Sequence, residues 1–283
     1  MDNWDELRTA YAVARRGTVS GAAAALGVHH ATVIRHVDAL EARLGVKLFQ
    51  RHARGYTPTE AGEELARVAG ATDDQFAQLA AKLSGPGAEL SGDLVVTALS
   101  SFTSRLVPLL AAFRETHPGV RLRYRTGRRL FRLEYGEAHV AVRAGNPPAE
   151  PDNVVQPLTR IDFALFAAPQ YVARNGKPGA DFAGHPFVGP DDDNPGSPLL
   201  RWTLENIEPE AIVFRASDDV SLAAAVRAGL GLGFLATDEA EGMVEILPPR
   251  PEWQVTLWLV THVDLHRSAK VQALTRHLKA AFP

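Results

Sequence analysis

The chain has 283 residues, of which 46% are hydrophobic and 22% charged, ordinary values for a globular protein with enough material for two domains. The formal net charge of −3 gives no overall indication of nucleic-acid binding, so a DNA-binding surface has to be recognised from a local cluster of charge. The absence of cysteine excludes disulfides, thiolate catalysis and cysteine-based metal sites.

The N-terminus begins with acidic residues rather than an apolar signal segment, and no run of about 18 apolar residues occurs in the sequence. We therefore expect a cytoplasmic protein without a membrane partner. The first predicted element is a helix, because apolar residues at a helical spacing start at Trp4 and the pattern stops near Gly17. Ser20 is expected to cap a second helix, which ends at Gly27.

A third helix is expected from about residue 30 to 44, and only three residues separate it from the second helix. So short a connection, with small alanine side chains on the second helix, is typical of a helix-turn-helix. Two short strands at 46–49 and 56–58 follow and predict a β-hairpin wing. Residues 1–59 are thus predicted to form a winged helix-turn-helix domain.

A long helix is predicted at 60–82, with Thr59 as its cap. Along it, six residues are spaced by alternating steps of four and three, which is typical of the seam between paired helices. Packing against its own domain is the alternative, but a helix between domains has no local core to cover it, so we favour self-association. Residues 60–91 are expected to be the linker helix and hinge. The predicted dimerisation residues are Leu65, Ala69, Thr72, Phe76, Leu79 and Leu83.

From residue 92 to 283 strands and helices alternate, which predicts an α/β domain with mainly parallel sheets. Residues 144–157, rich in Pro and Gly, are a plausible passage between two lobes. Lobe I is expected at about 92–162 together with 263–283, and lobe II at about 163–262. The predicted strands are 94–96, 120–124, 139–142, 163–167, 211–214, 230–235 and 255–260, with later helices near 198–207, 218–228 and 266–281.

The first 62 residues resemble the LysR-type transcriptional regulators, because hydrophobic anchors and glycines recur at fixed offsets. The shared residues are Ala22, Ala23, Leu26, Val28, Arg35, 38–41, 44–51 and 57–62. Residues 133–143 and 225–235 resemble the same family's effector domain in the correct order.

The resemblance implies a multidomain fold: an all-α, winged helix-turn-helix N-terminal domain with a linker helix, then a two-lobed α/β effector domain of the type II periplasmic-binding-protein kind. It also implies promoter DNA and a small-molecule effector as partners, a homodimer through 60–83, and a homotetramer through the effector domains. RNA polymerase is a further candidate partner.

In a helix-turn-helix, the N-terminal end of the second helix meets base edges in the major groove. Arg35 can bond a guanine edge with two hydrogen bonds, Thr32 can donate to a base or phosphate, and Ile34 can touch a thymine methyl group. Cations around the wing would meet the duplex backbone. Each residue alone is as well explained as solvated surface, but together on one motif they favour DNA. The predicted DNA-binding residues are His29, His30, Thr32, Ile34, Arg35, His36, Lys47, Arg51, His52 and Arg54.

Two departures from the family pattern prevent any transfer of base preference. His29, His30 and Ala31 stand where the family commonly has Ser-Gln-Pro, and Ile34 stands where a hydroxyl residue is common. The histidines also raise the alternative of a metal site. His29 and His36 lie about two turns apart, so we expect no single-ion site there.

The best candidate effector site is the segment Ser100, Ser101, Phe102 and Thr103, which follows a strand and opens a helix where backbone N–H groups favour an anion. A simple helix cap is the alternative. A carboxylate is therefore the expected effector. The remaining candidates are Thr126, Arg143, Pro198, Leu199 and Asp218, although Arg143 could equally pair with Glu137, and Asp218 is more readily explained as a helix cap.

An enzymatic function is not expected. The glycines at 229, 231 and 233 follow a helix and enter a strand, which is the reverse of the dinucleotide-binding order, and the acidic residues 191–193 suit a solvated turn. No catalytic residue, cofactor or metal is predicted. The expected function is a ligand-responsive DNA-binding regulator; the alternative is a small-molecule binding module whose helical N-terminus contacts proteins.

Overall fold

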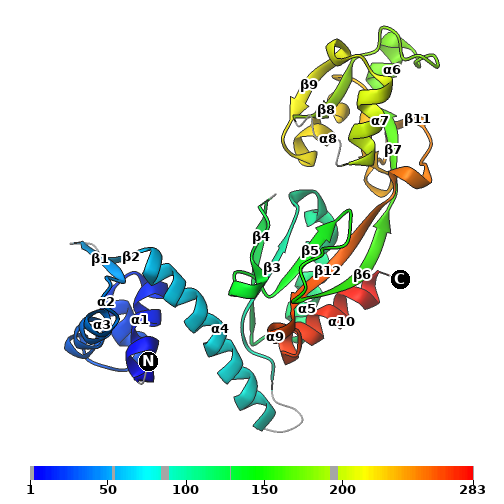
Figure 1. Ribbon diagram of the computed structural model, residues 1–283. Coiled ribbons are helices and arrows are strands. Elements are labelled where there is room, and N and C mark those ends of the chain that lie inside the picture. The colour runs from blue at the N-terminus through cyan, green and yellow to red at the C-terminus, as the bar shows by residue number, and fades with distance from the viewer. Residues whose placement is uncertain (1–2, 53–54, 84–88, 128, 192–196, 283) are drawn as a thin grey trace.

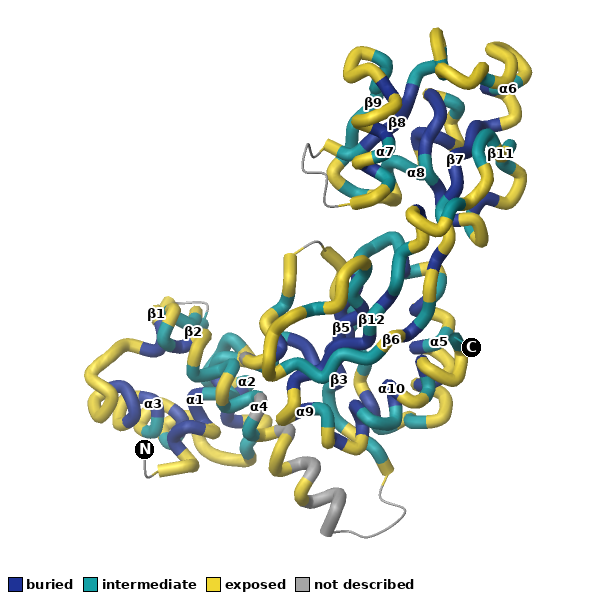
Figure 2. The backbone as a smooth tube through the Cα atoms, turned by 45° about the vertical axis from the view of Figure 1, so that its right-hand side comes forward, coloured by how far each residue is buried: buried dark blue, intermediate teal, exposed yellow. Residues whose placement is uncertain are grey.

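The computed structural model describes residues 3–52, 55–83, 89–127, 129–191 and 197–282. A helical N-terminal domain is followed by the long helix α4 (Glu60–Leu83), which leads to a two-lobed α/β body (Figure 1). Buried segments concentrate in the helices of the first domain and in the sheets of each lobe (Figure 2). Of the helices that the structure describes, none is both long and apolar enough to cross a membrane.

The N-terminal domain consists of three helices and a hairpin. Its elements are α1 (Trp4–Arg16), α2 (Val19–Leu26), α3 (His30–Leu44), β1 (Phe49–His52) and β2 (Gly55–Pro58). Gly27 adopts a left-handed conformation (φ 67°), which lets the chain leave α2 and enter α3 within three residues. The expected cap of the second helix is wrong: Thr18, not Ser20, accepts the hydrogen bond from the Gly21 N–H.

The first wing strand starts at Phe49 rather than at residue 46 as expected. The cause is Glu41 of α3, whose side chain is only 2% exposed. Its Oε1 accepts hydrogen bonds from the N–H groups of Leu48 and Phe49 at 2.9 and 3.2 Å, while Oε2 meets the Lys47 ammonium at 2.7 Å. The 46–48 segment is therefore held against α3, and the pairing with β2 begins at Phe49.

Lobe I is built on a mixed five-stranded sheet in the order β4-β3-β5-β12-β6. The strands β4 and β5 run parallel to β3, whereas β12 is antiparallel to both β5 and β6. Helices α5 and α10 pack their apolar faces into the core of this lobe. The elements are β3 (Gly92–Ala98), η1 (Ser100–Phe102), α5 (Thr103–Thr116), β4 (Val120–Thr126), η2 (Leu133–Tyr135), β5 (Val140–Ala144), β6 (Asn153–Ile161), β12 (Val255–His262), α9 (Val263–His266) and α10 (Ala269–Ala281).

Lobe II is inserted between β6 and β12. It contains the antiparallel sheet β10-β7-β11 and the parallel pair β8-β9. Trp253, fully buried, packs edge-on against Phe234 and Trp202 with ring centroids 4.8 and 5.5 Å apart. The elements are β7 (Phe163–Ala167), α6 (Pro169–Asn175), β8 (Phe187–Pro190), α7 (Pro198–Asn206), η3 (Pro209–Ala211), β9 (Ile212–Ala216), α8 (Asp219–Arg227), β10 (Gly233–Ala236), η4 (Thr237–Glu239), β11 (Val244–Leu247) and η5 (Pro251–Trp253).

Two expectations for this part are wrong. The sheets are mixed or antiparallel rather than mainly parallel, and strand β12, which was expected in lobe II, completes the sheet of lobe I. In lobe I the two errors have one cause. The chain leaves lobe I along β6, whose residues 153–157 were interpreted as irregular, and it returns along β12 beside β6 in the opposite direction.

Glu41 supplies a test of the N-terminal domain. Burial raises the pKa of Glu41, but hydrogen bonds from Lys47, Leu48 and Phe49 outweigh it, so the net pKa lies below its ordinary 4.5. The stabilisation is therefore present above the unfolded-state pKa and is lost as the pH falls through the lowered folded-state value. We expect Glu41→Gln to destabilise this domain by about 1–3 kcal/mol at pH 7, with the deficit shrinking below about pH 4.

Amide hydrogen exchange of α3 in the full chain measures this effect. Glu60→Gln, an exposed substitution in the first turn of α4, is the matched control and should change exchange little. Equal protection in both variants at pH 7 would show that Glu41 does not hold the wing to α3.

Candidate DNA-binding surface and effector pocket

Helix α3 presents a free face at its N-terminal end. Val33, Val37 and Leu40 are buried against the other helices, which turns the opposite side outward. His29 is the N-cap residue and makes no side-chain capping bond. His29, His30, Ile34 and Arg35 are exposed and Thr32 is half-buried, so five of the six predicted residues on this helix lie at an accessible end.

His36, the sixth, belongs to the packing of the domain. Its Nδ1 lies 2.9 Å from the Thr9 hydroxyl of α1, and its side chain is half-buried. This bond ties α3 to α1. His36 is thus less accessible than the other five residues, and its contact with a duplex stays a prediction.

Two of the four predicted wing cations, Lys47 and Arg51, are paired with acidic residues of α3. Lys47 pairs with Glu41 at 2.7 Å, and Arg51 pairs with Asp38 at 2.5 Å and with Glu41 at 3.2 Å while lying over the Tyr56 ring. The hydrogen bond that Arg51 donates to Asp38 raises the pKa of Arg51. Because these acids come from α3, 13 and 10 residues before Arg51, no local pattern signals the pairing. His52 is exposed, and Arg54 lies outside the described residues.

The linker helix α4 carries an apolar face that the chain itself covers only in part. Leu65 packs against the core of the N-terminal domain. Further along, Phe76 and Leu79 are 51% and 50% exposed, and Phe76 makes an edge-on contact with Trp4 at 5.4 Å. Ala69 and Thr72 are half-buried, and the side chain of Leu83 lies outside the described residues. The sequence-based seam thus divides into an intramolecular part and an exposed part.

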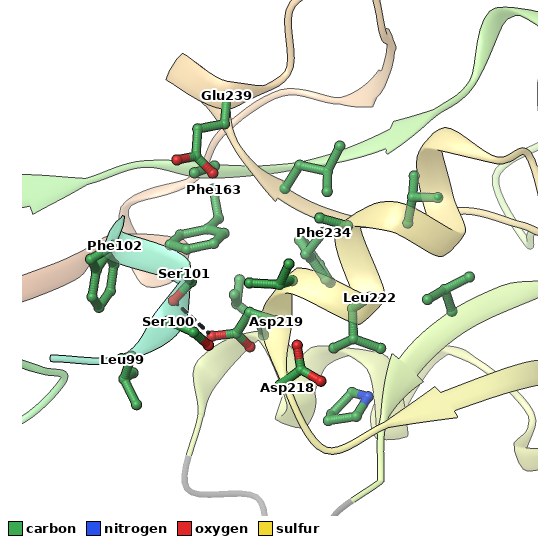
Figure 3. Close-up of a pocket in the computed structure, with 18 of the residues that line it drawn as sticks. Leu99, Ser100, Ser101, Phe102, Phe163, Asp218, Asp219, Leu222, Phe234 and Glu239 are labelled. Atoms are coloured by element: carbon green, nitrogen blue, oxygen red, sulfur yellow. Dashed lines mark hydrogen bonds between the residues drawn. The ribbon is translucent and has the colours of Figure 1, made fainter. Parts of the chain in front are cut away.

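A cavity of about 1000 Å³ lies between the two lobes. Lobe I contributes η1 and the start of α5, and lobe II contributes α8, β10 and η4 (Figure 3). Its size is at the upper end of the range for pockets that hold small molecules. All four residues of the predicted segment 100–103 line it.

The lobe I wall combines hydroxyl groups with an apolar anchor. Phe102 is almost fully buried in the lobe core and fixes the segment, while Ser100, Ser101 and Thr103 are half-buried at the cavity. The Ser101 hydroxyl donates to the Asp219 carboxylate of lobe II at 3.2 Å, so the two lobes touch across the cavity (Figure 3).

On the lobe II wall, Asp218 is the N-cap of α8, the role that the sequence favoured. Its two oxygens accept from the N–H and hydroxyl of Ser221 at 2.9 and 2.7 Å, and these bonds lower the pKa of Asp218. Leu199 lines the cavity. Pro198, the first residue of α7, is not among the lining residues.

Thr126 and Arg143 do not face this cavity, which corrects the expectation that they would. Arg143 lines a separate pocket of about 250 Å³ near Phe131. It bonds Glu150 at 3.2 Å and the Phe131 carbonyl at 3.4 Å. The alternative pairing with Glu137 is also wrong, because that carboxylate accepts hydrogen bonds from the Arg129 guanidinium and the Arg132 N–H.

Sequence reasoning missed an ionic cluster to which the cavity-lining residues Ser104, Arg105 and Glu239 belong. Arg105 of α5 donates to both oxygens of Asp238, at 2.9 and 2.5 Å, and to Glu239 at 2.7 Å, and the Ser104 hydroxyl also reaches Glu239. The hydrogen bond from Arg105 lowers the pKa of Asp238. These partners are 133 and 134 residues apart, so only the fold brings them together.

The glycines that follow α8 are explained by the conformation and packing of the backbone. Gly229 has φ +79° and ends the helix, and a side chain at Gly231 would strike the carbonyl of Pro186. The run leads from a helix into β10, so it is not a nucleotide-binding turn. Among the residues that the structure describes, no group of three or more His, Asp or Glu side chains is placed to hold a metal ion.

Two family models match the chain. Residues 4–63 match "Bacterial regulatory helix-turn-helix protein, lysR family" and residues 87–283 match "LysR substrate binding domain". The regulator BbuR of Bordetella bronchiseptica is 30% identical over 93% of this chain and 85% of its own length. The activator IlvY of Salmonella typhimurium is 37% identical over 58% of this chain and 57% of its own length.

Solved structures share the fold. ArgP from Mycobacterium tuberculosis has a TM-score of 0.68 at 22% identity, covering 99% of this chain and 97% of its own. The Corynebacterium glutamicum regulator LysG with bound effector Arg has a TM-score of 0.62 at 21% identity, covering 99% and 97%. CbnR, complexed with its target DNA, has a TM-score of 0.61 at 19% identity, covering 99% of each chain.

The two family models together account for nearly the whole chain, in the order in which the structure shows a helix-turn-helix and a two-lobed domain with a cavity. The chain therefore belongs to the LysR family: it is a transcription regulator with a DNA-binding helix-turn-helix and an effector-binding domain, and it is not an enzyme.

Proposed function

We propose that this regulator contacts promoter DNA through the N-terminal end of α3, with Arg35 as the principal base-reading residue. The observation that carries this is the exposure of Arg35 on the face of α3 opposite the buried Val33 and Val37. An arginine in that position can bond a guanine edge with two hydrogen bonds. Thr32 and Ile34 flank Arg35. Thr32 would contact a phosphate or a base, and Ile34 would contact a thymine methyl group.

The histidines and the wing have secondary roles. His29 and His30 lie exposed at the helix start, where phosphates would pass. His52 is an exposed residue of the wing that the structure does not pair with an acid among the described residues. Lys47 and Arg51 hold the wing on α3 through Glu41 and Asp38, so their attraction to phosphates is reduced by those acids.

The effector would occupy the cavity between the lobes and change the angle between them. A ligand shifts a conformational equilibrium only through different contacts in the two states, and Ser101–Asp219 is a contact that such a ligand would replace. We propose domain limits of 1–59, 60–91 and 92–283. The change in lobe angle would alter the placement of paired DNA-binding domains.

The proposal extends to the oligomeric state and the cellular location of the protein. The exposed Phe76 and Leu79 on α4 would pair with a second copy to form a homodimer, and effector domains would join dimers into a tetramer. RNA polymerase is a candidate partner at the promoter. Because the target is chromosomal DNA, we place the protein in the cytoplasm.

Arg35→Ala tests the DNA contact. We expect it to lower the affinity for DNA from upstream of the protein's own gene by about 1–3 kcal/mol and to relax sequence preference, because one bidentate base contact is lost. A gel-shift titration at several salt concentrations measures both effects. Arg114→Ala removes an equally exposed arginine from α5 and should bind like the wild type. A wild type without salt-sensitive binding to this DNA would overturn the proposal.

Leu79→Glu tests the dimer. A carboxylate buried between two helices is costly, so this variant should sediment as a monomer at concentrations where the wild type is dimeric. Leu79→Met keeps an apolar side chain of similar volume and should remain dimeric. Analytical ultracentrifugation distinguishes the two. An unchanged sedimentation coefficient for Leu79→Glu would place the dimer contact elsewhere.

A further inference from the structure

The cavity between the lobes has an uneven distribution of charge. Its lining includes three carboxylates, Asp218, Asp219 and Glu239, and two guanidinium groups, Arg105 and Arg227. Two of the acids are already engaged: Asp218 caps α8 through Ser221, and Glu239 is paired with Arg105. Asp219 is the third carboxylate, and its contacts differ from those of the other two.

Asp219 has unused capacity to accept hydrogen bonds. An ionised carboxylate offers about four acceptor positions. Among the residues that the structure describes, Asp219 has one polar contact, the Ser101 hydroxyl at 3.2 Å, which is long for an O–H···O bond. Asp219 is exposed at the cavity, and its carboxylate faces the hydroxyl wall of lobe I (Figure 3).

Neither lining cation neutralises this carboxylate. Arg105 directs its guanidinium to Asp238, Glu239 and the Ser101 carbonyl. Arg227 lies at the opposite end of α8, about 12 Å along the helix from Asp219, and donates to the Glu239 carbonyl. A simple carboxylate at Ser101 would thus lie directly beside an uncompensated negative charge.

An apolar wall adjoins this polar pair. Leu222 is one turn after Asp219 on α8, and Phe163 and Phe234 reach the same cavity from β7 and β10 (Figure 3). The side chains of Val226 and Leu199 extend the surface. A bare metal ion gains nothing from such a wall, whereas an organic body does.

We propose that the effector is an organic amine, with its protonated amino group between Asp219 and the Ser101 hydroxyl and its apolar body against Leu222, Phe163 and Phe234. The ammonium group supplies three donors and a positive charge, which Asp219 and Ser101 can accept. An α-amino acid fits as well as a simple amine, because its carboxylate can take the hydroxyls and N–H groups at the start of α5. This inference rests on the proposed function, since it names the ligand of the same pocket.

Matched ligand pairs test the proposal on the full chain. The probes are L-leucine, L-phenylalanine, hexylamine and phenethylamine, each compared with the molecule that carries a hydroxyl in place of the amine. Isothermal titration should show that at least one amine binds at least about tenfold more tightly than its hydroxyl partner, because a charge-assisted hydrogen bond is lost. Comparing the affinities of the two amino acids with those of the two simple amines shows whether a carboxylate contributes to binding.

Variants locate the contact. Asp219→Asn keeps the size and the bond to Ser101 but removes the charge, and should abolish most of the preference for the amine. Glu205→Gln, an exposed substitution on α7 of the same lobe, should leave it unchanged. The melting temperature without ligand verifies that each variant is folded.

The proposal is overturned if no amine of the panel binds the wild type, if the hydroxyl partners bind as tightly, or if Asp219→Asn retains the full preference. The gel-shift titration of the unliganded protein is independent of this outcome. A chain that binds DNA and rejects amines keeps its proposed function and loses only the ligand class. A chain that binds amines but not DNA keeps the proposed ligand class and loses the proposed function.

Discussion

The effector-binding domain depends on one constraint: the chain passes between the lobes only twice. It leaves at the junction of β6 and β7, around Asp162, and returns between Trp253 and Val255. Gln254 on the returning strand donates to the Asp162 carboxylate at 2.9 Å, which ties the two passages together. Because each lobe has its own core, the space between them need not be filled by packed side chains. The cavity is a direct consequence of this construction.

The N-terminal domain was the part most fully predictable from sequence, because its determinants are local. Three helices with their apolar faces, and glycines that end each of them in the left-handed conformation, can be recognised within windows of about 15 residues. The wing was predicted less well. The start of β1 is set by Glu41 on α3, a long-range hydrogen-bond acceptor that has no sequence signature.

The candidate sites show the same difference between residues with local determinants and residues with long-range ones. The residues at 100–103 and Asp218 were predictable because a strand end followed by a helix start is a local pattern. Arg143 was misplaced because its position at a strand end does not say which side of the sheet it faces, and the structure turns it toward Glu150. Arg105 and Asp238 were missed because their pairing requires both lobes to be folded. The mixed strand directions were not predicted for a related reason. The alternation of strands and helices along the chain does not fix the order of the strands in a sheet.

Asp93, the second residue of β3, has a consequence for the whole regulator. Its carboxylate is shared between Arg15 at the end of α1 and Arg121 of β4, each at 2.7 Å. One acidic group thereby joins the DNA-binding domain to lobe I. Both arginines are considerably exposed, so this joint is weak and is screened by dissolved ions. Ionic strength therefore sets how firmly the DNA-binding domain is held to lobe I, because added salt weakens the contacts that both arginines make with Asp93.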